Sequence, residues 1–355
     1  MPVQSQIPHT TPTPCKMKPY PSRKRKYELR LEYAGLLFTA ILLMASCNST
    51  SYEVSDDDNM IFDKAMQNAV LANEGFIRCE NYMEAWLAEA DPETRLVPRR
   101  LYGPDKDIWN AQDCAADNYP FLVLTSFFTN QGLYNGLIRE MLDNEIRLTS
   151  RVKSMPDTYS FSRKGFLHDS VSMDRVIFGT SEYIKDGLIP VTEWLGESPW
   201  SQRLVTMLSD MDEYVKVADE FAREGFGSSP VAEVNGELLQ VLSRMYWMTG
   251  EQKYLDWATQ IADHFLLGAG YPLRGFDYLK LRDHGCELVA GLCELYVTLH
   301  YADKEKQHAY REPLYALLDY ILAHGRNEDG LFYNAIIQRP AQSSIRDWQI
   351  PGVIH

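Results

Sequence analysis

The sequence predicts an all-helical protein built from helical hairpins, and three observations lead to that prediction. Apolar residues recur at three-and-four spacing over most of the chain from residue 60 onward. A pair of apolar stripes joined by a short turn at Gly250 is followed, about fifty residues later, by a second such pair. Segments with the pattern of a strand are scarce, and 175–179 is the best candidate. We therefore expect stacked pairs of antiparallel helices.

The helices can be justified in chain order. The first hairpin that the pattern defines clearly has one apolar stripe beginning at Leu238 and a second beginning at Tyr254, with Gly250 suited to the C-terminus of the first helix. The next hairpin has stripes beginning at Leu288 and Leu314 and ends at Gly325. Earlier helices are expected over four ranges, which are 60–90, 118–130, 134–151 and 203–224.

The first 46 residues are expected to be an export signal that lies outside the fold. A basic cluster at 23–26 precedes an apolar run from Tyr33 to Ala45, which is shorter than the roughly 20 residues of a spanning helix. The run closes with LMASC, similar to a bacterial lipobox in which Cys47 is lipidated. The alternative is a plain signal peptide with an incidental cysteine. Residues 47–59 are polar and acidic, which predicts a flexible tether to the membrane.

The charge of the chain argues against nucleic-acid binding. Lys and Arg total 35 against 49 Asp and Glu, a net charge of −14. From Cys47 onward 28 positive charges face 47 negative ones, and this net charge of −19 repels phosphate backbones. No phosphate-binding glycine loop, GxSxG, HExxH or zinc-type Cys/His spacing occurs. No metal site and no cofactor are therefore predicted.

Part of the chain resembles a known group of enzymes. The segment NGELLQVLSRMYWMTGEQKYLDWATQIADHFL, followed by DHGCELVAGLCELY and NEDGLFYN, is similar to the six-hairpin glycosidase superfamily. The resemblance covers roughly 105–345 and rests on the texture of the hairpins. It implies an (α/α)6 toroid over 60–355, with the active site in loops that precede the inner helices. It also implies a carbohydrate as the partner.

The expected toroid is incomplete. Six hairpins of about fifty residues need around 300 residues of helical body, and long loops take up much of the available chain, so only four or five hairpins can be counted. The tail QIPGVIH has no helical rhythm. We therefore expect a product truncated at its C-terminus.

Two carboxylates near the start of the helical body are the first catalytic candidates. Asp113 and Asp117 share a face if the segment is helical, and neighbouring carboxyls can have their pKa values driven apart for acid and base roles. The alternative for Asp117 is an N-cap of the helix that contains Pro120 in its first turn. Trp109, expected in a loop, offers a flat face for a sugar ring.

The densest polar cluster lies before the second hairpin. Asp283, His284 and Glu287 fall within one helical turn and offer an acid, a base and an imidazole, although Asp283 is also a good helix cap. At the equivalent place one hairpin earlier, Asn235 is expected to cap a helix. His168 is a further candidate for ligand contact.

The predicted function is that of an exported, lipid-anchored glycoside hydrolase of the outer membrane or periplasm. Asp113 and Asp283 form the expected carboxyl pair, and substrate contacts are expected from Trp109, His168, His284 and Glu287. A polysaccharide lyase using His284, Tyr278 and Arg282 is one alternative. A non-catalytic glycan-binding or scaffold lipoprotein is the other.

Overall fold

The computed structural model describes residues 56–215, 230–274, 278–282 and 286–337, and most of them are helical, as predicted. By their contacts residues 1–65 and 66–355 form two units, and of the first only the opening of helix α2 is described. Cys47 and the expected export signal lie outside the described residues. None of the helices in the described ranges is long and apolar enough to cross a membrane.

The first half of the described chain alternates helices with short strands. In chain order it contains α2 (Asp56–Ala88), the 3-10 turn η1 (Pro104–Asp107), β1 (Ile108–Trp109), the π-helical turn η2 (Ala111–Ala115), α3 (Tyr119–Thr129), α4 (Gln131–Leu133), the π-helical turn η3 (Tyr134–Ile138) and α5 (Arg139–Thr149). These helices match three of the predicted ranges. Because α2 begins at Asp56, the last residues expected in the tether are helical.

Two strand pairs and a long interrupted helix follow. The strands are β2 (Ser150–Val152), β3 (Met155–Pro156), β4 (Tyr159–Ser160) and β5 (Gly165–Phe166), and the helical elements are α6 (Met173–Glu182), the π-helical turn η4 (Tyr183–Leu188), α7 (Ile189–Leu195) and α8 (Pro199–Val215). Strand β4 pairs antiparallel with β1 and β5, and β2 pairs antiparallel with β3. In this way β1 is fixed beside β4, with Trp109 opposite Tyr159.

The prediction of a strand at 175–179 is wrong. These residues belong to α6, whose N-cap is Ser172, and the Ser172 hydroxyl accepts from the backbone N–H of Arg175. The β-branched and aromatic residues of the segment favour a strand locally, but Val176 is completely buried and Ile177 nearly so on the inner face of the helix. Burial of that helical face outweighs the weak local preference.

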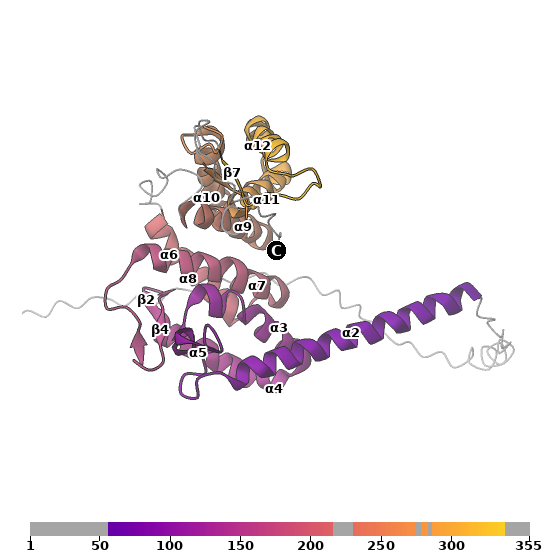
Figure 1. The fold of residues 1–355 in the computed structure, drawn as a ribbon, viewed down its shortest axis with the longest axis vertical. Helices are drawn as coiled ribbons and strands as arrows, with labels where there is room; N and C mark the ends of the chain where they lie inside the picture. Colours follow the sequence, from indigo (N-terminus) through magenta and orange to yellow (C-terminus); the bar gives the residue numbers. More distant parts are fainter. Residues whose placement is uncertain (1–55, 216–229, 275–277, 283–285, 338–355) are drawn as a thin grey trace, which may run out of the picture. The chain divides into compact units, whose positions relative to one another are not determined.

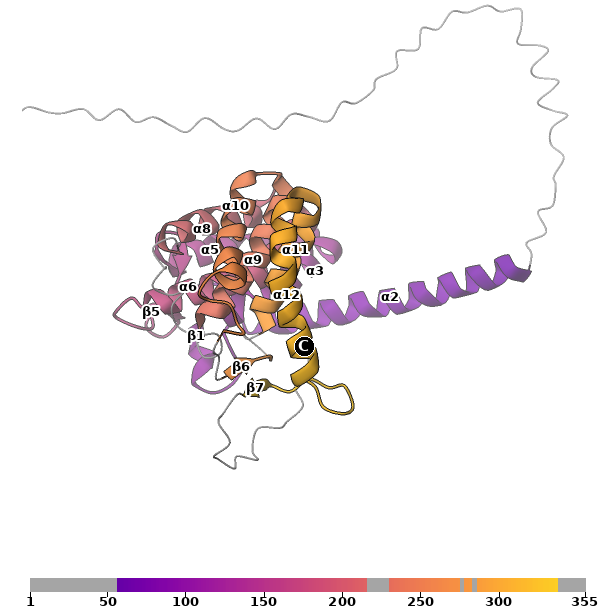
Figure 2. The same ribbon diagram turned by 90° about the horizontal axis from the view of Figure 1, so that it is seen from above.

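The second half of the described chain contains the two predicted hairpins, which lie side by side in Figures 1 and 2. Gly250, at a φ of 71°, lies in the turn between the first pair of helices, and Asp303 caps the last helix through the backbone N–H groups of Glu305 and Lys306. The elements are α9 (Pro230–Thr249), α10 (Gln252–Ala262), the π-helical turn η6 (Asp263–Leu267), β6 (Tyr278–Lys280), α11 (Cys286–Ala302), α12 (Lys304–His324) and β7 (Ala335–Ile337).

Helix α9 is the centre of this half. It contacts both α10 and α11, and it also packs against α6 and η4. Because α9 begins at Pro230, Asn235 lies inside the helix, and the prediction that Asn235 caps it is wrong. Strands β6 and β7 pair antiparallel near the end of α12, where the backbone N–H of Tyr333 donates to the carbonyl of Gly325 (Figure 2).

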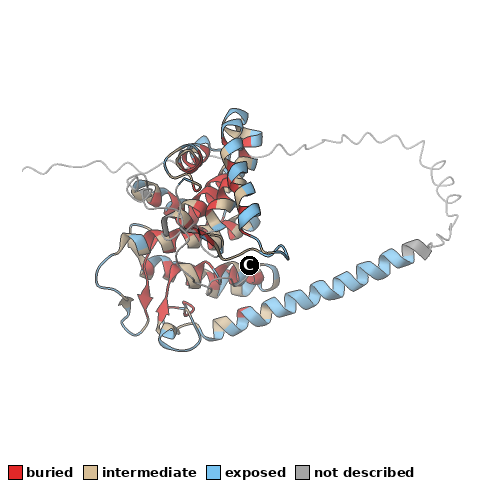
Figure 3. Cartoon of the chain, turned by 45° about the horizontal axis from the view of Figure 1, so that its top comes forward, coloured by how far each residue is buried: buried red, intermediate tan, exposed pale blue. Residues whose placement is uncertain are grey.

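Buried residues concentrate where the helices face one another, whereas much of α2 is exposed (Figure 3). Met66, Val70 and Leu71 of α2 are each more than 60% exposed. Among the charged groups of the core, Glu145 and Arg203 form an ion pair of 2.7 Å with side chains 0% and 2% exposed. At this place the core encloses two opposite charges that neutralise each other.

Candidate functional site

A group of polar side chains, most of them acidic, surrounds η4 in the described part of the chain. Asp113 and Asp117 approach it from the η2 segment, and Lys185 and Asp186 belong to η4 itself. Glu182 immediately precedes η4, and the remaining members, Glu233, Glu237, Gln240 and Glu287, come from α9 and α11. We call this set the η4 acidic cluster. It joins segments that are more than 170 residues apart in the sequence.

Asp113 is held in place by two neighbouring side chains, those of Asn110 and Arg99. Asn110, the N-cap of η2, accepts a hydrogen bond from the backbone N–H of Asp113 at 3.2 Å, and its side-chain amide donates to the Asp113 carboxylate. Arg99 Nε lies 2.8 Å from Asp113 Oδ2, and the Asp113 side chain is 34% exposed. The carboxylate of Asp113 is therefore oriented by an amide and a guanidinium while it stays open to solvent.

Asp117 lies at the surface close to Asp113. Partial desolvation, followed by the negative charges of Asp113 and Asp186, raises the pKa of Asp117 to about 6. The N-cap of α3 is Asn118, so the alternative in which Asp117 caps that helix is wrong. The side-chain amide of Asn118, the residue after Asp117, donates to the backbone carbonyl of Asp113. This hydrogen bond ties together the segment that contains both aspartates. Asp117 is thus an exposed carboxyl that gains and loses its proton near neutral pH.

Lys185 connects η4 to the start of α11. Its Nζ lies 2.9 Å from Glu287 Oε2 and 3.1 Å from Asp186 Oδ1. The same Glu287 oxygen accepts from the side-chain amide of Gln240 at 2.6 Å. Burial alone would lower the pKa of Lys185, but Asp186 and Glu287 outweigh it and the pKa is raised. Glu287, predicted to contact substrate, thus has one oxygen engaged by two groups of the protein.

Three glutamates form the inner part of the η4 acidic cluster. Glu182 ends α6, and Glu233 and Glu237 lie one turn apart on α9. One carboxylate oxygen from each lies within 4.8 Å of the others. Glu233 is 3% and Glu237 is 1% exposed, whereas Glu182 is half-buried. Carboxylates brought this close have to be neutralised by protons or by a cation.

Glu237 is the member of the cluster whose burial is least offset by hydrogen bonds. The Glu237 side chain is closed off from solvent. Neither of its carboxylate oxygens has a hydrogen-bond partner in the structure. The neighbouring Ser181 hydroxyl donates instead to the carbonyl of Phe178 at 2.9 Å. Burial, and then the charge of Glu182, raises the pKa of Glu237 well above its ordinary value, and burial with Asp186 raises that of Glu182. In the absence of a cation these carboxyls hold protons at neutral pH.

The expectation for Trp109 is wrong. Trp109 lies in β1 and is 0% exposed, and its indole N–H donates to the Tyr119 hydroxyl at 3.0 Å. A side chain enclosed in this way has no free face on which a sugar ring can stack. The pairing of β1 with β4, which the sequence pattern did not reveal, is what draws Trp109 into the core.

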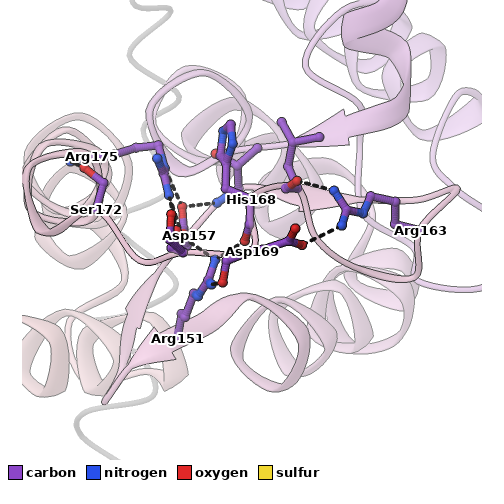
Figure 4. Close-up of polar contacts among 10 residues, drawn as sticks. Arg151, Asp157, Arg163, His168, Asp169, Ser172 and Arg175 are labelled. Atoms are coloured by element: carbon purple, nitrogen blue, oxygen red, sulfur yellow. Dashed lines mark hydrogen bonds and ion pairs between the residues drawn. The ribbon is translucent and has the colours of Figure 1, made fainter.

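His168 belongs to a different polar network, shown in Figure 4. It is exposed, and its backbone carbonyl accepts from Arg151 at 2.7 Å. Arg151 and Arg175 both pair with the buried carboxylate of Asp157, at 2.9 Å and 2.8 Å. Burial alone would raise the pKa of Asp157, but the hydrogen bonds from Arg175 and from the backbone of Thr158 lower it. This network anchors the loop that carries His168.

Asp283 and His284 lie outside the described residues, so their predicted roles stay predictions. Glu182 and Glu233 were not among the residues predicted from the sequence, because the position of Glu182 beside α9 depends on how α6 packs on that helix. One local signal existed, since Glu233 and Glu237 are four residues apart and a helix places such residues on the same face.

No protein-family model, no curated protein and no solved structure matches this chain.

Proposed function

We propose that the chain is a carbohydrate-active enzyme, a glycoside hydrolase whose acid and base groups are Asp117 and Asp113. The observation that carries this proposal is the contrast between the two neighbouring carboxyls. Asp117 has a pKa raised to about 6, whereas Asp113 is paired with Arg99. Glycoside hydrolysis needs one carboxyl that gives a proton and a second that is ionised.

The division of labour follows from the surroundings of each group. Asp117 is exposed, and in its protonated form it donates to the oxygen of the leaving sugar. Asp113, oriented by Asn110 and Arg99, activates water or attacks the anomeric carbon. Asp186, whose charge also acts on Asp117, and its partner Lys185 provide polar contacts for sugar hydroxyls. Asp283, the carboxyl first expected to pair with Asp113, is not needed in this scheme.

The proposal includes the architecture and location that the resemblance implies. Two consecutive hairpins, α9 with α10 and α11 with α12, pack through α9 and α11, as successive units of an (α/α)6 toroid do. The chain is proposed to be exported, with Cys47 lipidated and the body held at a membrane surface. The acidic charge of that body suits neutral rather than polyanionic glycans.

A substrate screen tests the proposal directly. The purified chain is incubated with a panel of plant and host polysaccharides, and both new reducing ends and ultraviolet absorbance of conjugated uronates are measured. Hydrolysis gives reducing ends without the absorbance. Asp117→Asn is expected to lower kcat by about 100-fold or more with little change in KM. Glu294→Asn, remote in sequence from both carboxyls, serves as a matched control and retains activity.

Other outcomes identify the alternatives. Products that absorb in the ultraviolet indicate a lyase, and tight glycan binding without turnover indicates a binding protein. Turnover that is unchanged in both Asp117→Asn and Asp113→Asn removes the assignment of the catalytic pair.

A further inference from the structure

We infer that Glu182, Glu233 and Glu237 form a binding site for a hard divalent cation, with Ca²⁺ the best fit. The inference is independent of the proposed hydrolase activity, because it concerns the inner glutamates and not the Asp113–Asp117 pair. It also departs from the sequence analysis, which predicted no metal site.

The geometry of the three carboxylates suits a single ion. One oxygen from each residue lies within 4.8 Å of the others. Calcium binds oxygens at about 2.4 Å, so one ion can touch oxygens that are up to about 4.8 Å apart. The ligands come from the end of α6 and from two successive turns of α9, and these helices are in direct contact. The ligands are therefore carried by packed helices, which restrict their movement.

A second observation points to a ligand at this place. Glu237 is 1% exposed, and both of its carboxylate oxygens lack a hydrogen-bond partner. The adjacent Ser181 hydroxyl donates to the carbonyl of Phe178, and it lies near enough to Glu237 to lower the pKa of that carboxyl, although burial outweighs this effect. A buried carboxylate without partners is costly, and coordination to a cation supplies the missing interactions.

The surrounding charges leave room for a cation. The positive charge of Lys185 acts on Glu182 and Glu237, and its Nζ is already paired with Asp186 and Glu287. Arg244, which comes from the next turns of α9, is paired with Glu294 at 2.8 Å. Both of these cationic side chains are thus paired with carboxylates other than Glu237. A divalent ion supplies further positive charge at the three glutamates.

The chemistry of the donors selects the class of ion. All three ligands are carboxylates, and neither imidazole nor thiolate belongs to the set. Hard cations such as Ca²⁺, Mg²⁺ and Mn²⁺ prefer oxygen donors, whereas Zn²⁺ and Cu²⁺ favour nitrogen or sulfur. Ca²⁺ tolerates irregular geometry and two-oxygen binding by glutamate, whereas Mg²⁺ requires shorter bonds and a near-octahedral shell. The set of three glutamates, each able to bind through one or two oxygens, therefore favours Ca²⁺.

The test uses the whole chain, stripped of metal with a chelator. CaCl₂, MgCl₂ and MnCl₂ are titrated separately by calorimetry, and the melting temperature is followed at the same concentrations. At a hundredfold excess over Kd, a bound ion is expected to raise Tm by about 5 °C. Glu237→Gln keeps the shape of the side chain, removes its charge and is expected to abolish both the heat of binding and the shift in Tm.

Controls separate this site from general attraction to an acidic protein. Glu294→Gln, which removes a part-buried carboxylate on α11, is expected to bind and respond as the unmodified chain does. Glu233→Gln is a second test of the site if Glu237→Gln does not fold, as judged by circular dichroism without added metal. The inference is overturned if none of the three ions stabilises the chain, or if the folded Glu237 or Glu233 variant responds as strongly as Glu294→Gln.

Discussion

Gly236 of α9 and Gly291 of α11 face each other where the two helices cross. A Cβ atom added to Gly236 would overlap the backbone of Glu287 and Leu288, and one added to Gly291 would overlap the carbonyl oxygen of Gly236 and lie 2.7 Å from the Cβ of Leu239. The two helices approach so closely because neither glycine has a side chain. This contact brings Glu287 within hydrogen-bond distance of Gln240 and into its ion pair with Lys185.

Gly236→Ala is therefore expected to destabilise the protein. The added methyl group meets backbone atoms, which cannot rotate away, so α9 and α11 must separate. We expect a loss of about 3 kcal/mol, measured as a lower melting temperature. Gly136→Ala is the control, because a Cβ at Gly136 meets no atom within 4 Å. Equal melting temperatures for the two variants would contradict a close crossing.

The proposed roles of Asp117 and Asp113 predict a particular pH dependence. A general acid works only while it is protonated, so kcat/KM should fall as the pH rises through about 6, the raised pKa of Asp117. The negative charge of Asp113 contributes to that raised pKa. In Asp113→Asn, the fall of the remaining kcat/KM on the alkaline side of the pH profile should therefore occur at a lower pH. If this fall stays at the same pH, Asp117 is not the group that titrates.

Asp157 is expected to make the fold sensitive to acid. Its pKa is lowered in the folded protein, because the hydrogen bonds from Arg175 and Thr158 outweigh burial. Stability from this group is therefore complete above the ordinary aspartate pKa of about 4 and is lost as the pH falls through the lower folded-state value. Asp157→Asn should cost about 3–5 kcal/mol at pH 7, because two arginines lose their partner.

Melting temperatures of Asp157→Asn and of the unmodified chain, measured from pH 7 down to pH 2, check this prediction. The gap between the two proteins should narrow as the pH falls. Asp169→Asn is a matched control from the same polar network, since the Asp169 side chain is 92% exposed in its pair with Arg163. Such a pair is expected to contribute little, at most about 1 kcal/mol. Equal losses in the two variants would argue against a special role for Asp157.

The proposed lipid anchor predicts a change in location. In cells that express the whole chain, Cys47→Ser should move the protein from the membrane fraction to the soluble fraction, because the lipid is attached through the cysteine sulfur. Cys15→Ser, which alters the other cysteine of the N-terminal region, should leave the protein with the membrane. Fractionation followed by immunoblotting distinguishes the two results. A membrane-bound Cys47→Ser variant would contradict lipidation at this residue.

The hairpins were predictable because their signal is local. Apolar residues beginning at Leu238, Tyr254 and Leu288 recur at helical spacing, and a helix buries one such face wherever it packs. The helix at 173–182 was not predictable in this way. Its segment 175–179 is rich in residues that favour strands, and the capping hydroxyl of Ser172 was the signal that pointed to a helix.

The candidate site was predictable only in part. Asp113 and Asp117 were recognised because they are four residues apart, and their electrostatic coupling is also a local relationship. The role of Asn235 was mistaken because α9 begins at Pro230, about one and a half turns earlier than a cap at Asn235 would place it. Glu182 gave no local signal at all, since its partners Glu233 and Glu237 lie more than fifty residues away.

The sequence by itself determined the helical class, the hairpin rhythm and the four-residue spacing of Asp113 and Asp117, because these depend on residues within one or two helical turns of each other. The tertiary structure alone decided that Trp109 is enclosed by β1 and its neighbours and that three glutamates converge beside η4. Side chains from separate helices meet only where packing brings the helices together, as the crossing of Gly236 and Gly291 does for Glu287. Burial then raises the pKa values of Glu182 and Glu237.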